Sequence, residues 1–307
     1  MNPAFSVVVF TTVAGAAQGL VVTLALAALA GMPLAPGFLG LSLTVAEAML
    51  LIGLGASFGH LGRPERAWRA VLMWRTSWLS REVIVLPTFM AVVALWWLAV
   101  RSGIHAPWLP LAAIAVAALL WYCTAMIYAC LRFIQEWAQP LTLVNFALIG
   151  LSSGLVLASA MAALRGETAL LLVSGPCAFA VTLAAWCTRT LSLRRNASLV
   201  PRSTLQTATG IRAPKLVQKS MGMSAGSFNT REFFHGASRA VLKQVKLGFL
   251  VLCFALPALL LLWGMAAQST LAFVLALLVQ VPGLVAERWF FFAQARHPQN
   301  LYYQVVS

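Results

Sequence analysis

Acidic residues are almost missing from this sequence. It contains no aspartate, and its seven glutamates face 21 lysines and arginines in 307 residues. Calcium and magnesium sites draw on carboxylate oxygens, so the sequence excludes a carboxylate-rich metal centre. Charged residues of either sign make up only 9% of the chain, whereas apolar residues make up 61%. A water-soluble globular domain cannot have this composition, so lipid must surround most of the chain.

Cysteine and histidine are also scarce. The five cysteines lie in apolar stretches without a Cys-x-x-Cys motif, which indicates buried packing: Cys123, Cys130, Cys177, Cys187 and Cys253. Iron–sulfur clusters need closely spaced thiolates, so we expect no cluster in this chain. A haem between helices would need two intramembrane histidines, and of four histidines only His60 ends an apolar run with a plausible interior position. We therefore expect neither haem nor another metal here.

Long apolar runs dominate what is present. Eight runs of about 20 residues are poor in charge, and each is long enough to cross a bilayer: 6–29, 38–58, 83–100, 108–130, 141–163, 169–189, 247–265 and 270–292. No lysine or arginine precedes the first run and no small-residue cleavage pattern follows it, so we expect no removable signal peptide. The sequence predicts an all-α fold, a bundle of about eight transmembrane helices in which residues 1–307 form a single membrane domain.

Basic residues are distributed unequally between the two sides of this topology. Nineteen lysines and arginines lie on the side of the termini, against Arg101 and Arg165 on the other. The positive-inside rule therefore predicts cytoplasmic termini. The two long connections, residues 60–82 and 190–246, are predicted to lie on the same side.

The connection 60–82 has the pattern of an interfacial amphipathic segment. Pro64 suits the first position of a helix, and Trp68, Val71, Leu72 and Arg75 recur at helical spacing. Such a segment lies in the plane of the membrane surface.

The connection 190–246 is predicted to be a basic cytoplasmic loop. Its charge suits anionic lipid headgroups, a partner protein or nucleic acid, but no nucleic-acid recognition motif accompanies it, so we do not expect nucleic acid as a partner. Asn229, three residues before Glu232, resembles a capping box and predicts the start of a basic amphipathic helix that runs into the seventh span.

Glu47 lies in the middle of the second apolar run. A carboxylate at that depth is costly unless it is protonated, paired or facing water, so Glu47 is either functional or a protonated group that bonds to a neighbouring helix. The small residues from Gly55 to Gly59 at the end of this run predict a close approach by another helix.

His60 and Glu82 end the second run and open the third on the same side of the membrane. A quinol that gives up two electrons also loses two protons, and an imidazole and a carboxylate are suited to accept them. Both residues also suit structural roles, because a histidine caps the negative end of a helix and a glutamate favours the positive end.

The stretch His60-Leu-Gly-Arg-Pro64, continued by Ser77-Trp-Leu-Ser-Arg-Glu82, closely resembles the membrane anchor subunit of the DMSO reductase family. The resemblance covers essentially the whole chain, including the ending Glu287 to Tyr303. The run Gly210 to Glu232 is similar to the anchors of cytoplasm-facing sulfite dehydrogenase complexes within that family.

This resemblance implies a quinone-reactive anchor in a complex of three subunits in the bacterial cytoplasmic membrane. It implies an iron–sulfur subunit, a molybdopterin catalytic subunit that carries the molybdenum, and menaquinone or ubiquinone bound at His60 and Glu82, with Glu47 assisting or structural. Sulfite oxidation is favoured over DMSO-type reduction. Arg63, Arg66, Arg69 and Arg81 would dock the iron–sulfur subunit. A small-molecule permease that uses Glu47 for coupling and a purely structural tether are the alternatives.

Overall fold

The computed structural model describes residues 1–59, 61–220 and 232–302, and this part of the chain is helical without any β-strand. Eight of its helical segments are long and apolar enough to cross a membrane, which confirms the predicted fold. They are α1 (Phe5–Leu29), α2 (Pro36–Phe58), α3 (Trp78–Arg101), α4 (Trp108–Ala129), α5 (Pro140–Arg165), α6 (Thr168–Ala197), the combined segment Arg239–Ala266, and α11 (Thr270–Ala293).

Three of these segments extend further than the apolar runs. On the side of the long connections, α3 begins five residues early, α6 continues to Ala197, and the seventh segment begins at Arg239. The added turns contain arginine, lysine and serine, whose charged or polar ends reach water from a helix that projects above the lipid. A search for apolar runs therefore finds the part of each helix inside the lipid and misses the turns outside it.

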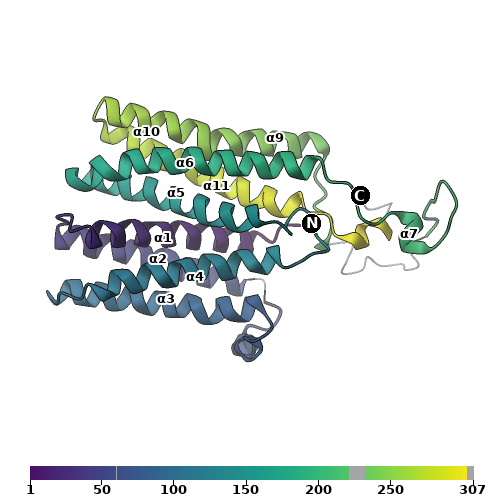
Figure 1. Ribbon diagram of the computed structural model, residues 1–307, viewed down its shortest axis with the longest axis horizontal. Coiled ribbons are helices and arrows are strands. Elements are labelled where there is room, and N and C mark those ends of the chain that lie inside the picture. The colour runs from purple at the N-terminus through teal and green to yellow at the C-terminus, as the bar shows by residue number, and fades with distance from the viewer. Residues whose placement is uncertain (60, 221–231, 303–307) are drawn as a thin grey trace.

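The bundle consists of two four-helix groups that meet between α1 and α5 (Figure 1). The first group contains α1 to α4 in chain order. The second contains α5, α6, α11 and the segment made of α9 (Arg239–Phe249), the π-helical turn η2 (Leu250–Ala255) and α10 (Leu256–Ala266). The N-terminus, the end of α11 and the short helix α7 (Leu205–Thr209) all lie at one end of the bundle (Figure 1).

Glycines bring α1 and α5 into backbone contact. A Cβ atom at Gly19 would lie 2.1 Å from the carbonyl oxygen of Gly150, and one at Gly154 would lie 2.0 Å from the carbonyl carbon of Gly19. Two helices approach this closely only where small residues face each other. Of the small residues from Gly55 to Gly59, for which a close approach was predicted, a Cβ at Gly55 would meet nothing within 4 Å, whereas one at Gly59 would lie 3.6 Å from the Cβ of Ser6 on α1.

The π-helical turn coincides with a proline that interrupts the seventh segment. Pro257 has no N–H to donate to the carbonyl of Cys253 one turn earlier. Gln280 on α11 supplies a donor instead, with its Nε2 3.3 Å from that carbonyl oxygen and also 3.3 Å from Ser152 Oγ. Side-chain amides thus satisfy backbone groups that lipid cannot.

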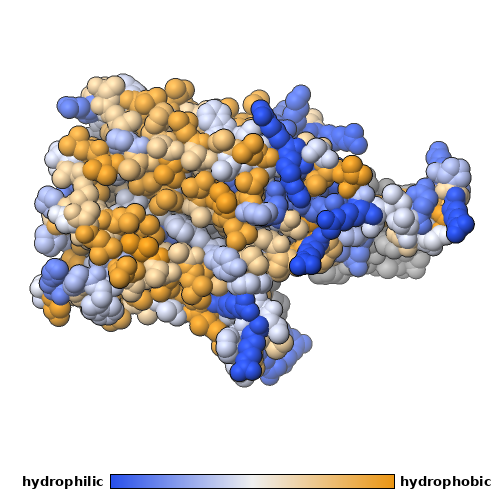
Figure 2. Space-filling view, in the orientation of Figure 1, coloured by the Kyte–Doolittle hydropathy of each residue, from blue (hydrophilic) through white to orange (hydrophobic). Residues whose placement is uncertain are grey.

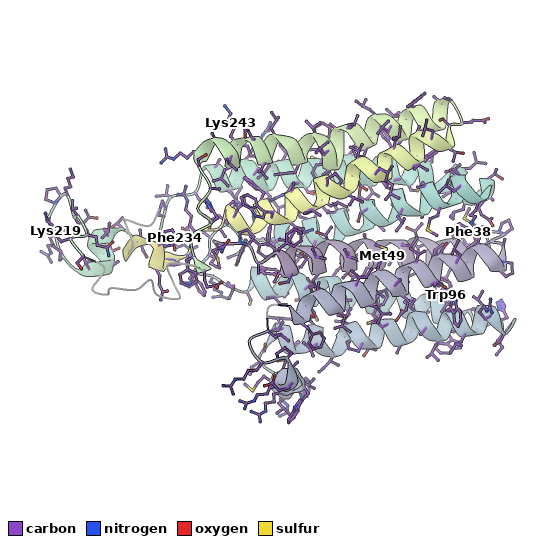
Figure 3. All side chains as sticks on the ribbon, turned by 180° about the vertical axis from the view of Figure 1, so that it is seen from behind. Phe38, Met49, Trp96, Lys219, Phe234 and Lys243 are labelled. Atoms are coloured by element: carbon purple, nitrogen blue, oxygen red, sulfur yellow. The ribbon has the colours of Figure 1, made fainter. Side chains whose placement is uncertain are left out.

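Apolar side chains cover the flanks of the bundle, and hydrophilic residues gather at the end that carries the connections (Figure 2). Figure 3 shows Lys219 far out on this polar end, whereas Phe38 and Trp96 lie at the opposite end of the bundle. The exposed flank residues include Leu51, Leu98 and Leu172. An apolar flank between two polar ends is what a bilayer requires.

The amphipathic helix predicted within the basic connection begins later than its capping pattern indicated. Asn229 lies outside the described residues, and residues 233–238 are not helical. The helix α9 begins at Arg239, where the Ser238 side chain accepts a hydrogen bond from the backbone N–H of Val241. The helix that continues into the seventh span therefore begins at Arg239 and not at the predicted capping pattern.

Candidate functional site

Glu82 lies in the first turns of α3 and is buried inside the bundle. Only 5% of its surface is exposed, and its Oε1 accepts a hydrogen bond from the Thr124 hydroxyl near the end of α4. The start of α3 is fixed by Ser77, whose side chain accepts a hydrogen bond from the backbone N–H of Ser80. A carboxyl group held at this depth by another helix can exchange a proton with a ligand or with a relay.

His60, the predicted partner of Glu82, lies outside the described residues. The helices on either side of it are described: α2 ends at Phe58 and α3 begins at Trp78. These ends lie at the same end of the bundle (Figure 1). The topology predicted for the pair is therefore present, and contact between the two side chains remains a prediction.

The connection between α2 and α3 forms a 3₁₀ helix, η1 (Pro64–Met73), with Pro64 at the predicted first position. All of its residues are exposed or half-buried, and its large apolar side chains Trp68, Leu72 and Met73 are among the exposed ones. Because η1 has so little buried surface of its own, another group must hold it against the bundle.

Arg81 provides that hold. Its Nε donates to the carbonyl of Trp74 and its Nη2 to the carbonyl of Arg75, each over 2.9 Å, while its guanidinium carbon lies 4.0 Å from the centre of the Trp78 ring. The other three predicted docking residues are exposed: Arg63 precedes η1, and Arg66 and Arg69 lie on it. Arg66 and Arg69 contact only their sequence neighbours, Glu65 and the Trp68 ring. Arg81 differs from them because it bonds to backbone carbonyls six and seven residues away.

Glu47 lies deeper in the bundle than Glu82. It is half-buried, and its Oε2 is buried without a hydrogen-bond partner among the described residues. At about 1.5 Å per residue, Glu47 is about 16 Å along α2 from Phe58, whereas Glu82 is about 6 Å along α3 from Trp78. Figure 3 shows the nearby Met49 midway along the bundle. The carboxyl groups of Glu47 and Glu82 therefore lie at different distances from the end of the bundle that carries the long connections.

A buried charged cluster joins α6 to α11, and the sequence analysis missed it. Arg189 Nε lies 2.6 Å from Glu287 Oε1, and Arg288 Nε lies 3.4 Å from Glu287 Oε2. All three side chains are at most 4% exposed. Arg189 and Arg288 were counted as residues flanking the membrane, although the position of Glu287 and Arg288 inside an apolar run signals intramembrane charge.

An exposed groove lies on the polar end of the molecule. Its volume is about 490 Å³, and its wall combines residues 200–201, 203–206 and 214–216 with Leu301. Val200 is 78% exposed there. Apolar side chains exposed at the polar end, away from the lipid-facing flank, are typical of a protein-binding surface.

Comparison with known proteins identifies the family of this chain. The family described as DMSO reductase anchor subunit (DmsC) matches residues 1–294. A protein of Allochromatium vinosum named as a sulfite dehydrogenase subunit is 48% identical to this chain over 326 aligned positions, and the alignment covers the whole of both proteins. These findings confirm the resemblance read from the His60 to Glu82 signature: the chain is a multi-pass membrane protein that belongs to the DMSO reductase anchor subunit family.

Proposed function

We propose that this chain anchors a molybdenum oxidoreductase of three subunits in the bacterial cytoplasmic membrane and exchanges electrons and protons with quinone. The observation that supports it most directly is the buried Glu82 carboxyl group, which bonds to Thr124 and lies in the first turns of α3, the helix that follows the exposed connection η1. A lipid-soluble quinone approaches from the bilayer, and a buried carboxyl group near the membrane surface is suited to transfer its protons.

In this proposal, Glu82 and His60 are the hydrogen-bond and proton-transfer partners of menaquinone or ubiquinone. Glu47 has an assisting or structural role, since it lies about 10 Å deeper by the helical rise. Quinone reduction takes up two electrons and two protons. The electrons come from an iron–sulfur partner subunit, because this chain has no redox centre in the proposal.

The exposed arginines Arg63, Arg66 and Arg69 and the groove beside Val200 are proposed to bind that iron–sulfur subunit. Both surfaces lie on the end of the bundle that carries the long connections. A partner bound there would reach the side of the membrane at which Glu82 is buried. We further propose that this end faces the cytoplasm, because most of its charges are basic.

Sulfite is the proposed substrate of the molybdopterin subunit. The support is the 48% identity to a protein named as a sulfite dehydrogenase subunit, over the full length of both chains. In that reaction electrons run towards quinone. The test is to purify the complex through a tag on this chain, measure molybdenum, iron and quinone by mass spectrometry, and assay sulfite:quinone and quinol:DMSO turnover. If the complex reduces DMSO and does not oxidise sulfite, electrons run from quinol to the substrate, opposite to the proposed direction.

The site itself is tested in the same complex with the double variant H60A/E82A. We expect the complex to assemble and quinone-linked turnover to fall, whereas reduction of the partner subunits by the substrate stays unchanged. Unchanged quinone-linked turnover would remove the site assignment and favour the purely structural tether. Solute uptake by the chain alone in liposomes, without co-purifying subunits, would favour the permease.

A further inference from the structure

A small internal cavity lies between α1, α4, α5 and α11. Its water-accessible volume is about 20 Å³, and its wall includes Thr12, Trp121, Thr124, Gly150 and Arg288. A volume of about 10–15 Å³ on this measure is enough for one water molecule if polar partners are present. The cavity therefore has room for a water molecule.

Two polar atoms in the cavity wall have no protein partner. Thr12 Oγ1 and Trp121 Nε1 are both buried and form no hydrogen bond with the described residues. A buried donor without a partner destabilises the protein, and an internal water molecule would provide the missing partner. Arg288 adds further N–H donors and is only 3% exposed. These groups supply the two to four bonds that an internal water makes.

The same cavity reaches Glu82 through Thr124. Thr124 lines the cavity, and its hydroxyl bonds to Glu82 Oε1. A hydroxyl group donates one hydrogen bond and accepts others, so Thr124 can donate to the carboxylate and accept from a water at once. Thr124 is thus the link between the carboxyl group and the cavity.

We propose that this cavity is an internal water site and that Thr124 relays protons between its water and Glu82. Only the use of the relay in quinone chemistry rests on the proposed function. When the Glu82 carboxyl group gives its proton to a reduced quinone, the Thr124 hydroxyl passes its own proton to Glu82 Oε1 and takes one from the water. Bulk water at the polar end of the bundle is the net proton donor and replaces the proton that the cavity water gives up, so no charge accumulates on Thr124 or in the cavity.

The packing around the cavity keeps it open. A Cβ atom at Gly150 would lie 2.7 Å from Trp121 Nε1 and 3.0 Å from the carbonyl oxygen of Gly15. A larger residue at position 150 would clash with the indole nitrogen of Trp121, so this part of the cavity wall requires glycine. Gln18, on the same wall, donates to the carbonyl of Ala117 over 3.2 Å and ties α1 to α4.

The first test measures proton exchange at Glu82 without quinone. The intact complex is transferred from H₂O to D₂O, and the shift of the Glu82 carboxyl C=O band, identified by its loss in E82Q, is followed by infrared spectroscopy. We expect T124V to slow this exchange at least about tenfold and T124S to restore it, because only the hydroxyl matters. Exchange as fast in T124V as in the wild type would overturn the proposal.

The role of water is tested with substitutions that remove the two cavity groups without a protein partner. T12V and W121F remove those groups, and we expect each to slow the exchange. The matched controls are T88V and W263F, which alter side chains exposed on the flank of the bundle and should leave the exchange unchanged. If T12V and W121F behave like these controls, Glu82 exchanges protons by a route that avoids the cavity, and the proposal fails.

Turnover separates this inference from the proposed function. If both hold, T124V retains quinone binding but has lower quinone-linked turnover and a larger solvent deuterium isotope effect, and T124S recovers both. If the wild-type complex binds no quinone while T124V still slows exchange at Glu82, the proposed function fails and the relay stands.

Discussion

Arg189 on α6 and Glu287 on α11 form an ion pair of 2.6 Å inside the bundle, where both side chains are almost completely buried. Arg288, the next residue of α11, lies 3.4 Å from the second carboxylate oxygen and 4.0 Å from the centre of the Phe146 ring. The cluster therefore contains two positive charges and one negative charge. In a low-dielectric interior the carboxylate is the essential member, because it is the counter-ion of both arginines.

We predict that E287Q destabilises the bundle more than any single change on its lipid-facing flank. It leaves two buried guanidinium groups without their counter-ion, and breaking a buried pair costs about 3–5 kcal/mol. The measurement is the thermal unfolding of the complex in detergent.

The double variant R189M/E287M is the control for that prediction. This variant leaves one buried guanidinium group without its counter-ion, that of Arg288, where E287Q leaves two, so we expect it to recover part of the stability lost in E287Q. If the double variant is as unstable as E287Q, the unpaired Arg189 is not the source of the cost.

Glu82 and Glu47 are predicted to differ strongly in their effect on quinone chemistry. Loss of a proton-transfer group lowers turnover by about 100-fold or more, so E82Q should show a loss of that size. E47Q should lower turnover by less than about tenfold, because Glu47 lies at a different depth. Steady-state assays of both variants in the intact complex give the comparison, and an equal loss would place Glu47 in the site.

Hydropathy and charge could predict most of the fold from the sequence. The eight apolar runs predicted the eight spans, and Pro64 predicted the start of η1. The glycine crossing of α1 and α5 was missed because spacing alone does not say which helices face each other. Gly55 and Gly59 have the same spacing as Gly15 and Gly19, and only packing distinguishes them.

From the sequence, a site residue could be predicted only where its own type and position suggest a function, and not where its role depends on a partner that is distant in the sequence. Glu82 was found because a carboxyl group near an apolar run is rare. Thr124 was missed, because a threonine in an apolar helix commonly bonds to its own backbone, and its partner is 42 positions away. Arg189 was missed because it lies at the end of an apolar run, where arginine usually reaches water.

Arg81 is predicted to hold η1 against the bundle. R81A removes two hydrogen bonds from a charged donor to the carbonyls of Trp74 and Arg75, so amide hydrogen exchange in residues 64–76 should become at least about tenfold faster. R81K should not rescue it, because a lysine cannot bond both carbonyls and cover the Trp78 ring in the same way. T88V, a change at an exposed position further along α3, is the control and should leave exchange in residues 64–76 unchanged.

The charge distribution predicts that the end of the bundle with the long connections faces the cytoplasm. A green fluorescent protein inserted after Ser203, in the basic connection, should fluoresce, and alkaline phosphatase inserted there should be inactive. The pattern should be reversed after Gly103, in the short connection between α3 and α4. The reason is that basic segments are retained in the cytoplasm. The opposite pattern would place Glu82 near the outer surface and move the proposed docking surfaces to that side.

Mild acid is predicted to loosen the polar end of the molecule. The rings of His297 and Phe233 are stacked with their centres 4.0 Å apart. Burial, and secondly the positive charge of the amino terminus, lower the pKa of His297 below its ordinary value of 6.5. His235 lies in the same region, and its pKa is lowered for the same two reasons. Both imidazoles are therefore held in the neutral form in the folded protein.

The lowered pKa values of the two histidines make the folded protein less stable in acid. A histidine whose folded pKa is depressed contributes its full stability above its unfolded pKa of 6.5 and loses it as the pH falls through the folded value. The protection of residues 232–238 against hydrogen exchange, measured relative to the intrinsic amide exchange rate at each pH, should therefore decrease between pH 7 and pH 5. H297F keeps an aromatic ring against Phe233 and removes one titrating group, so it should weaken this pH dependence. An unchanged dependence in H297F would assign the effect to His235 or to the amino terminus.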